Sequence, residues 1–216
     1  MILSMFKKIK KIRYQIKAYK KLILNKESFL YQTGWMNSLY LKKPIDRDGN
    51  NIPWMNYSIV EFLKERLTKD ITLFEYGSGF STLFYSTHVN NVISIEYNKK
   101  WFDYLKKIPS SNSEIYFYEK DFDGKYCRAI HDFEYLYKIV IVDGRDRVNC
   151  IKQSVSKLTC DGVIILDDSN RKYYKDGIIF LNEHGFRELS FYGLKPNEAF
   201  TSKTSVFYRD NNCLGI

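Results

Sequence analysis

The alternation of apolar runs and helical periodicity along most of this chain predicts an α/β domain. Beyond residue 70, short runs rich in Val, Ile, Phe and Tyr alternate with stretches whose apolar residues recur every three or four positions. The runs predict strands at Thr72–Tyr76, Val92–Tyr97, Glu114–Tyr118, Tyr137–Val142 and Gly162–Leu166. The periodic stretches predict helices at Tyr57–Leu67, Ser81–Thr87, Lys99–Ile108, Arg145–Leu158 and Arg171–His184.

The order of these elements predicts the kind of sheet. Strands that alternate with helices form a parallel sheet with right-handed crossovers, and apolar runs such as 139–142 and 163–166 suit strands buried on both faces. The last two runs, Phe186–Gly193 and Thr204–Arg209, are separated by a loop too short for a helical crossover, so we expect them to pair antiparallel. The fold class is therefore α/β: a single Rossmann-like, doubly wound sheet of about seven strands, mostly parallel, with a C-terminal antiparallel hairpin and helices on both faces.

The first 26 residues carry the whole net charge of the chain. They contain nine Lys and Arg and no acid, which leaves 25 cations and 25 acids in residues 27–216 of a chain whose net charge is +9. Their apolar residues recur at helical spacing and predict a basic amphipathic helix: Ile2, Met5, Phe6, Ile9, Ile12, Ile16, Tyr19 and Ile23. We expect three parts, namely this helix at 1–26, an irregular connector or lid at 27–56, and a ligand-binding domain at 57–216.

The basic helix allows three interpretations, which the sequence leaves open. It can lie on an anionic membrane surface, pack on its own domain or on a twin subunit in a homodimer, or bind nucleic acid. The neutral body disfavours nucleic acid as a partner. No stretch approaches about 18 uncharged apolar residues, which argues against an integral membrane protein, and four widely spaced cysteines argue against a zinc finger or a disulfide scaffold. We therefore expect a cytoplasmic protein with reduced thiols, or one held peripherally at the inner membrane surface.

The turn after the first predicted strand has the pattern of a cofactor-binding loop. The strand runs into EYGSGFST, residues 75–82, in which Glu75 precedes two glycines, Gly77 and Gly79, at the start of a helix. Glu96 ends the second strand, where an acid can accept hydrogen bonds from ribose hydroxyls. Thr82 replaces the third glycine of a dinucleotide fingerprint, so an adenosine ligand without a pyrophosphate fits better. A tight turn that binds no ligand is the alternative.

Three more acids follow later strands and predict either a metal site or a set of ion pairs. Asp143 follows the fourth strand, and Asp167 and Asp168 follow the fifth, so all three should meet at the carboxyl edge of the sheet. Carboxylate oxygens alone suit Mg²⁺, Mn²⁺ or Ca²⁺ rather than zinc. The alternative is that these acids cap helices and pair with nearby arginines (Arg145, Arg147 and Arg171). His131, which precedes the fourth strand, is a candidate general base.

With these motifs in order, residues 57–209 resemble the class I S-adenosylmethionine-dependent methyltransferases. The resemblance rests on EYGSGFS, the acid in SIEYN, VDGRDR and ILDDS on successive strands. It implies S-adenosylmethionine as cofactor and a seven-stranded sheet. It also implies that Glu96 holds the ribose hydroxyls and that Asp121 meets the adenine amino group. The other cofactor-binding positions implied by the motif are Glu75, Tyr76, Gly77, Ser78, Gly79, Ser81 and Asp143.

Residues 142–169 are further similar to the cation-dependent O-methyltransferases of the caffeoyl-CoA type. That likeness implies a divalent ion, Mg²⁺ or another, on Asp143, Asp167 and Asp168, although Asp168 stands where that family has an asparagine. The connector PIDRDGNNIPWMNY resembles small bacterial methyltransferases, some of them associated with surface polysaccharide modification. We therefore expect an enzyme that O-methylates a small-molecule or glycan acceptor. Either the bound ion stabilises the developing alkoxide, or Asp143 or His131 accepts the proton as general base. The alternatives are an inactive cofactor-binding partner subunit and a nicotinamide oxidoreductase, which Thr82 disfavours.

Overall fold

The structure, a computed structural model, describes residues 2–216 and consists of two compact units. The first comprises residues up to 50 together with Pro196–Glu198, and the second comprises Asn51–Lys195 and Ala199–Ile216. Among the described residues, no helix is both long enough and apolar enough to cross a membrane.

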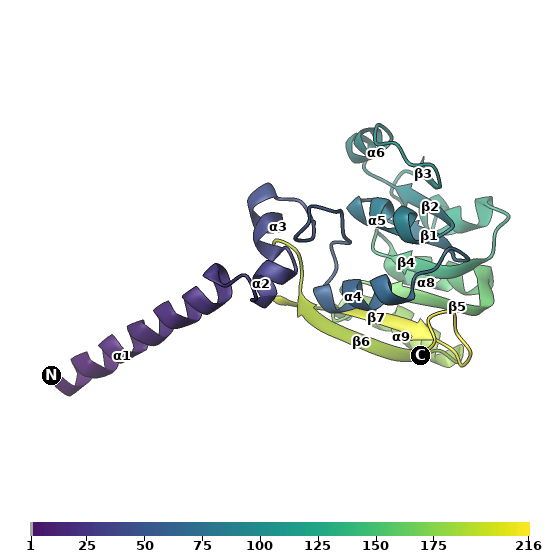
Figure 1. Cartoon of the computed structure of the whole chain (residues 1–216). Helices are drawn as coiled ribbons and strands as arrows, with labels where there is room; N and C mark the ends of the chain where they lie inside the picture. Colours follow the sequence, from purple (N-terminus) through teal and green to yellow (C-terminus); the bar gives the residue numbers. More distant parts are fainter. Residues whose placement is uncertain (1) are drawn as a thin grey trace. The chain divides into compact units, whose positions relative to one another are not determined.

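The first unit is helical (Figure 1). Its elements are α1 (Ile2–Tyr19), a π-helical turn (Lys20–Leu24), α2 (Phe29–Gln32) and α3 (Trp35–Leu41). The Ser28 hydroxyl accepts a hydrogen bond from the Tyr31 amide and so caps α2. The Trp35 indole donates to the Glu198 carbonyl at 2.7 Å, which anchors α3 within the unit. The segment 27–56, expected to be irregular, thus contains two short helices, while its role as a lid stays a prediction.

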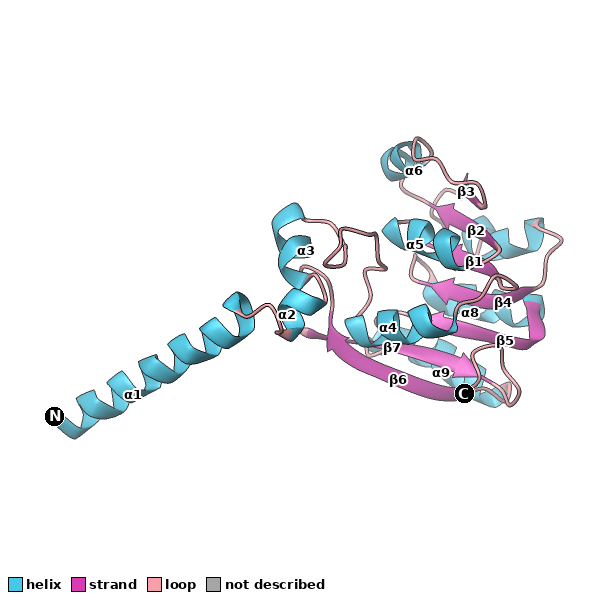
Figure 2. Ribbon diagram, in the orientation of Figure 1, coloured by secondary structure: helices cyan, strands magenta, loops and turns pink. Residues whose placement is uncertain are grey.

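The second unit is an α/β sandwich around one sheet (Figure 2). Its strands are β1 (Thr72–Tyr76), β2 (Asn91–Glu96), β3 (Ser113–Phe117), β4 (Tyr137–Val142), β5 (Leu158–Leu166), β6 (Arg187–Leu194) and β7 (Thr201–Tyr208). Its α-helices are α4 (Tyr57–Arg66), α5 (Phe80–His88), α6 (Lys99–Leu105), α7 (Lys125–Arg128), α8 (Arg147–Ser154) and α9 (Lys175–Glu183). Short 3₁₀ turns lie at Ala129–Asp132, Val155–Lys157 and Lys172–Tyr174.

The seven strands form one mixed sheet in the order β3-β2-β1-β4-β5-β7-β6, which confirms the predicted fold class. The first five strands in this order are parallel, and β7 pairs antiparallel with both β5 and β6. Because β7 lies between them, β6 runs in the same direction as β5. The carboxyl end of β6 therefore reaches the same edge of the sheet as the carboxyl ends of the parallel strands.

Alternate residues of the strands serve different faces of the sheet. On one face, Phe74 and Tyr76 pack into an apolar cluster with Tyr126 of α7 and Cys150 of α8. The opposite face carries α4 and α5 (Figure 2) and receives the intervening residue, Glu75. A buried acid in the middle of an apolar strand is thus a direct consequence of the strand's two-residue period.

The turns after β1 and β4 touch each other through their backbones. Gly77 has φ of +97°, and a Cβ added there would lie 2.9 Å from the Gly144 Cα. A Cβ at Gly144 would in turn lie 3.0 Å from the Tyr76 carbonyl carbon. Gly79, by contrast, has φ of −171°, and the nearest atom to an added Cβ is the Ser81 Oγ at 3.4 Å, an ordinary contact.

We expect Gly77→Ala to lower the free energy of unfolding by about 1–3 kcal/mol, because it combines a left-handed backbone with a clash against neighbouring backbone. Gly79→Ala should leave it nearly unchanged and is the matched control. Urea denaturation followed by circular dichroism measures both. Equal destabilisation by the two substitutions would contradict the assigned roles of the two glycines.

Candidate active site

Glu75 is the buried acid around which the first loop is organised. Its carboxylate accepts hydrogen bonds from the hydroxyls of Ser81 at 2.5 Å, Thr82 at 2.5 Å and Ser94 at 2.7 Å. Burial raises the pKa of Glu75 to about 7, although the three hydroxyl donors act in the opposite direction. Ser81 and Thr82 open α5, so the acid ties the end of β1 to the start of the following helix.

The Gly77–Gly79 turn is held by side chains from three directions. Thr82 accepts a hydrogen bond from the Gly79 amide at 2.9 Å, so its hydroxyl has a structural role where a dinucleotide fingerprint has glycine. The Ser78 hydroxyl bonds to that of Ser94 at 2.7 Å. The Trp101 indole, at the start of α6, donates to the Ser78 carbonyl at 2.9 Å. The turn is therefore fixed before any ligand binds.

Glu96 lies at the carboxyl end of β2 and is buried. Its Oε1 accepts the backbone amides of Tyr97 at 2.9 Å and Asn98 at 2.6 Å. Burial raises the pKa of Glu96, while the amides of Asn98 and Tyr97 lower it. Beside it, the Arg145 guanidinium lies over the Tyr97 ring and donates to the Tyr97 hydroxyl at 2.7 Å.

Arg147 joins the ends of β4 and β5. Its guanidinium pairs with the Asp143 carboxylate at 2.7 Å and donates to the Asp167 carbonyl at 2.5 Å. Burial and the neighbouring charge of Asp167 raise the pKa of Asp143, and Arg147 and Lys195 lower it; the net result is about 8. The Asp143 side chain is 25% exposed, whereas that of Arg147 is 8% exposed. Asp143 is thus the acid of this pair that solvent or a ligand can reach.

Lys195, which follows β6, closes the other side of the acid cluster. Its ammonium lies 2.6 Å from an Asp167 oxygen and 2.7 Å from an Asp168 oxygen, and its side chain is only 7% exposed. Thr204 donates to the second Asp167 oxygen at 2.6 Å, and Arg171 pairs with the second Asp168 oxygen at 2.5 Å. Burial alone would lower the pKa of Lys195, but Asp167 and Asp143 raise it, so it stays protonated.

The predicted metal ligands do not fit a divalent ion in this arrangement. All three carboxylates, Asp143, Asp167 and Asp168, already face cations of the chain, and the Lys195 ammonium bridges the latter two. Among the residues that the structure describes, no group of three or more His, Cys, Asp or Glu side chains could hold a metal ion. An ion at this edge would have to displace a buried lysine. The arrangement matches the alternative of ion pairs, with Arg147 and Arg171 in the expected roles.

Two other predicted cofactor-binding residues, Tyr76 and Asp121, use their side chains within the protein. The side chain of Tyr76 lies in the apolar core and donates to the Cys127 carbonyl at 2.7 Å, so only its backbone borders the loop. Asp121 accepts the amides of Lys125 at 2.6 Å and Tyr126 at 3.1 Å and thereby caps the start of α7.

His131 is not brought to the carboxyl edge. It lies in the 3₁₀ turn Ala129–Asp132, before the start of β4, and its Nε2 contacts Gln153 near the end of α8 at 3.1 Å. Asp143 follows the opposite end of β4. The strand therefore separates His131 from Asp143, and a role for His131 as general base stays a prediction.

Sequence reasoning missed Lys195, Trp101 and Tyr97. Trp101 and Tyr97 follow Glu96 closely, and an aromatic pair just after a candidate ribose-binding acid is a signal that could have been used. Lys195 had no such signal, because its approach to Asp167 depends on β7 entering the sheet between β5 and β6.

We expect Lys195→Met to create a metal site at Asp167 and Asp168, since it leaves these two carboxylates without their shared cation. The variant should lose about 3–5 kcal/mol of stability in EDTA and regain part of it in Mn²⁺. Thermal unfolding in EDTA and in Mn²⁺, with electron paramagnetic resonance of the ion, measures this. The double variant Lys195→Met/Asp168→Asn is the control that should not respond. Stabilisation of the wild type by Mn²⁺, abolished by Asp168→Asn alone, would restore the metal prediction.

The pKa of Glu75 predicts a pH dependence of stability. Because its folded pKa of about 7 exceeds the ordinary value of 4.5, the folded state binds the proton more tightly, and stability falls as the pH rises through this window. In Glu75→Gln, the loss of stability between pH 5 and pH 8 should be smaller than in the wild type by about 2–3 kcal/mol.

Glu188→Gln is the matched control for this titration. Burial alone would raise the pKa of Glu188, but hydrogen bonds from Lys203 and Ser205 lower it overall, so Glu188 does not titrate between pH 5 and pH 8. Urea unfolding at both pH values gives the comparison. An unchanged pH slope in Glu75→Gln would show that Glu75 is already ionised at pH 5 in the folded protein.

Comparisons with known proteins agree with this architecture. No protein-family model matches the sequence, and no curated protein matches it significantly. The structure is similar to a methyltransferase-like protein from Silicibacter pomeroyi, with a TM-score of 0.53 and 19% identity over 74% of this chain and 89% of that one. It is similar to an rRNA methylase from Streptococcus thermophilus, with a TM-score of 0.51 and 14% identity over 69% and 92% of the two chains. It is also similar to the O-methyltransferase TomG from Streptomyces achromogenes, in complex with S-adenosylmethionine, with a TM-score of 0.53 and 12% identity over 68% and 77%. The chain therefore has the fold of the class I S-adenosylmethionine-dependent methyltransferases.

Proposed function

We propose that this protein is an S-adenosylmethionine-dependent methyltransferase that methylates an oxygen of a small-molecule or glycan acceptor. The observation that carries the proposal is the pairing of the fixed Gly77–Gly79 turn with the buried carboxylate of Glu96 on the next strand. Because Gly79 has no side chain, a ligand can come close to its backbone, and Glu96 supplies an acceptor for ribose hydroxyls.

The residues present suit a nucleoside with no pyrophosphate. Thr82 occupies the position of the third glycine of a dinucleotide site. Its hydroxyl accepts a hydrogen bond from the Gly79 amide and donates one to Glu75. The bound cofactor would supply an activated methyl group on a sulfonium. The protein's own task is then to hold the acceptor in line with that methyl, exclude water and accept a proton.

Asp143 is the residue that we assign to the proton. Arg147 holds one of its oxygens, its side chain is partly exposed, and its pKa is raised towards neutrality, which suits a general base at physiological pH. As the new carbon–oxygen bond forms and the carbon–sulfur bond breaks, the acceptor hydroxyl releases its proton to Asp143. In this scheme Lys195 compensates the charges of Asp167 and Asp168, so the reaction needs no divalent ion.

An oxygen acceptor is supported by likeness alone. The segment PIDRDGNNIPWMNY resembles small bacterial methyltransferases, some of them associated with surface polysaccharide modification, and TomG, which shares the fold, is an O-methyltransferase. Nucleic acid is the competing acceptor, since a protein of similar fold is an rRNA methylase. The balance of 25 cations and 25 acids in residues 27–216 favours the smaller acceptor over a polyanion.

Isothermal titration of the full chain with S-adenosylhomocysteine and with NAD tests the cofactor assignment. We expect S-adenosylhomocysteine to bind and NAD not to. In Glu96→Gln the affinity should fall about five- to tenfold, roughly 1–1.4 kcal/mol, because a neutral amide accepts hydroxyl hydrogen bonds less strongly. Glu65→Gln, on the exposed side of α4, should have no effect. Tight binding of NAD without S-adenosylhomocysteine would overturn the proposal in favour of an oxidoreductase.

Transfer of a radiolabelled methyl group to fractionated glycans and small molecules separates an enzyme from an inactive partner subunit. Asp143→Asn is the control, since it keeps the shape of the site and removes the base. Label that appears with the wild type and not with Asp143→Asn supports the proposal. Binding of S-adenosylhomocysteine with no labelled fraction supports the inactive subunit.

A further inference from the structure

The N-terminal helix presents a bare apolar stripe. In α1, the exposed fractions are 64% for Phe6, 40% for Ile9, 47% for Ile12 and 51% for Ile16. Every side chain from residue 6 to residue 24 is exposed except Ile23, which is partly covered. Figure 1 shows α1 as one continuous helix.

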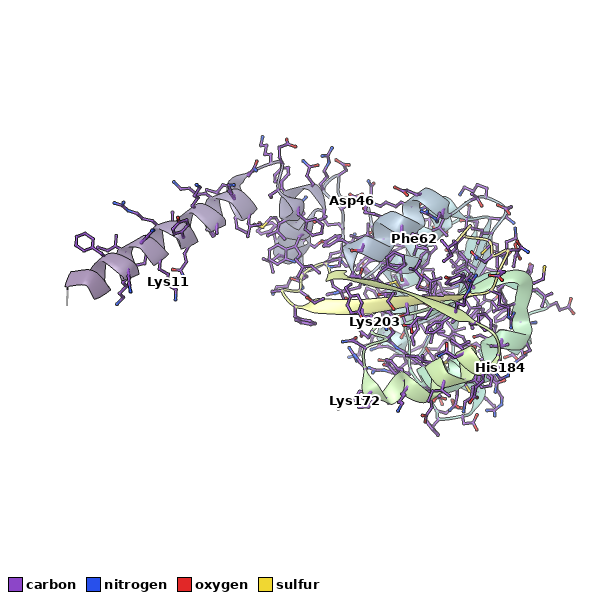
Figure 3. All side chains as sticks on the ribbon, turned by 90° about the horizontal axis from the view of Figure 1, so that it is seen from below. Lys11, Asp46, Phe62, Lys172, His184 and Lys203 are labelled. Atoms are coloured by element: carbon purple, nitrogen blue, oxygen red, sulfur yellow. The ribbon has the colours of Figure 1, made fainter. Side chains whose placement is uncertain are left out.

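Most cations of α1 lie outside the apolar stripe. At about 100° per residue, Ile9, Ile12 and Ile16 fall within roughly 60° of one another, and Phe6 lies next to them. Lys7 and Lys11 lie on the opposite side, and Figure 3 shows the labelled Lys11 side chain extending away from the helix. Arg13 falls between Phe6 and Ile9, and Lys17 lies at the edge of the stripe; long side chains at such positions can reach past an apolar boundary.

The charge decides which partner fits. Residues 1–26 hold nine cations and no acid, so a second copy of the helix would set nine cations against nine. The rest of the chain has no net charge to offset them. Nucleic acid would match the cations and leave the apolar stripe in water. An anionic bilayer matches both sides at once, with lipid headgroups for the cations and the acyl boundary for the stripe.

We propose that residues 2–24 are a docking surface for an anionic lipid bilayer. The helix lies in the plane of the interface, with Phe6, Ile9, Ile12 and Ile16 turned towards the acyl chains. Its cations lie at the level of the headgroups. This assignment does not depend on the methyltransferase proposal, and its test needs no substrate.

Flotation of the full chain with vesicles tests the assignment. We expect binding to vesicles of equal parts phosphatidylglycerol and phosphatidylcholine, a loss of binding on phosphatidylcholine alone, and a several-fold decrease at high salt. Ile12→Asn/Ile16→Asn should reduce the bound fraction at least tenfold. Tyr14→Asn/Ala18→Asn, which puts the same residue twice on the opposite side of the helix, is the matched control and should bind like the wild type.

Three results would overturn the assignment. The first is absence of wild-type binding to anionic vesicles at low salt. The second is equal binding by both double variants, which would reduce the helix to a general polycation. The third is a lipid-free dimer, measured by light scattering, that Ile12→Asn/Ile16→Asn dissociates, because it would show that a second copy covers the stripe. Circular dichroism and the thermal midpoint of each variant establish that the sheet unit remains folded.

Discussion

The site depends on how four acids can be accommodated at one edge of one sheet. Parallel strands bring Glu75, Glu96, Asp143 and Asp167 to the carboxyl edge, where water is scarce and like charges repel. Each acid is compensated differently: Glu75 by hydroxyls, Glu96 by backbone amides, and the two aspartates by a guanidinium and an ammonium. Hydroxyls and amides leave the pKa values of Glu75 and Glu96 raised, whereas the Lys195 ammonium forms direct ion pairs with Asp167 and Asp168. Carboxylates at equivalent positions, the carboxyl ends of neighbouring strands, therefore differ in their chemistry because their partners differ.

The sheet could be predicted closely because its information is local. The run Ile139–Val142 has no polar residue, which favours a strand buried on both faces of the sheet. The observed β4 has the predicted bounds. The start of β5 was missed by four residues, because Leu158–Asp161 mixes polar and apolar side chains while still pairing in part with β4. The antiparallel pair was correctly expected from its short loop.

The acid cluster could be predicted only in part, because its partners are set by topology. Nothing in the residues around Lys195 indicates that β7 enters the sheet beside β5 and carries the end of β6 to the acids. His131 is the complementary case. It is close to Asp143 in sequence, but the six-residue strand between them separates its two ends by about 20 Å. Asp121 has the expected place after β3, yet its oxygens are used on the backbone of α7.

The contact between the turns at Gly77 and Gly144 restricts how this chain can change. In most packed pairs, a larger residue on one side can be accommodated by a smaller one on the other, so that the two positions drift together. Here neither glycine has a side chain to shorten: a Cβ at Gly77 would meet the backbone of Gly144, and one at Gly144 would meet the Tyr126 hydroxyl and the backbone of Tyr76 and Gly77. No single compensating substitution exists at the partner glycine. A variant that enlarges either glycine therefore has to shift backbone in both loops, whereas the rest of the carboxyl edge can diversify through the side chains around them.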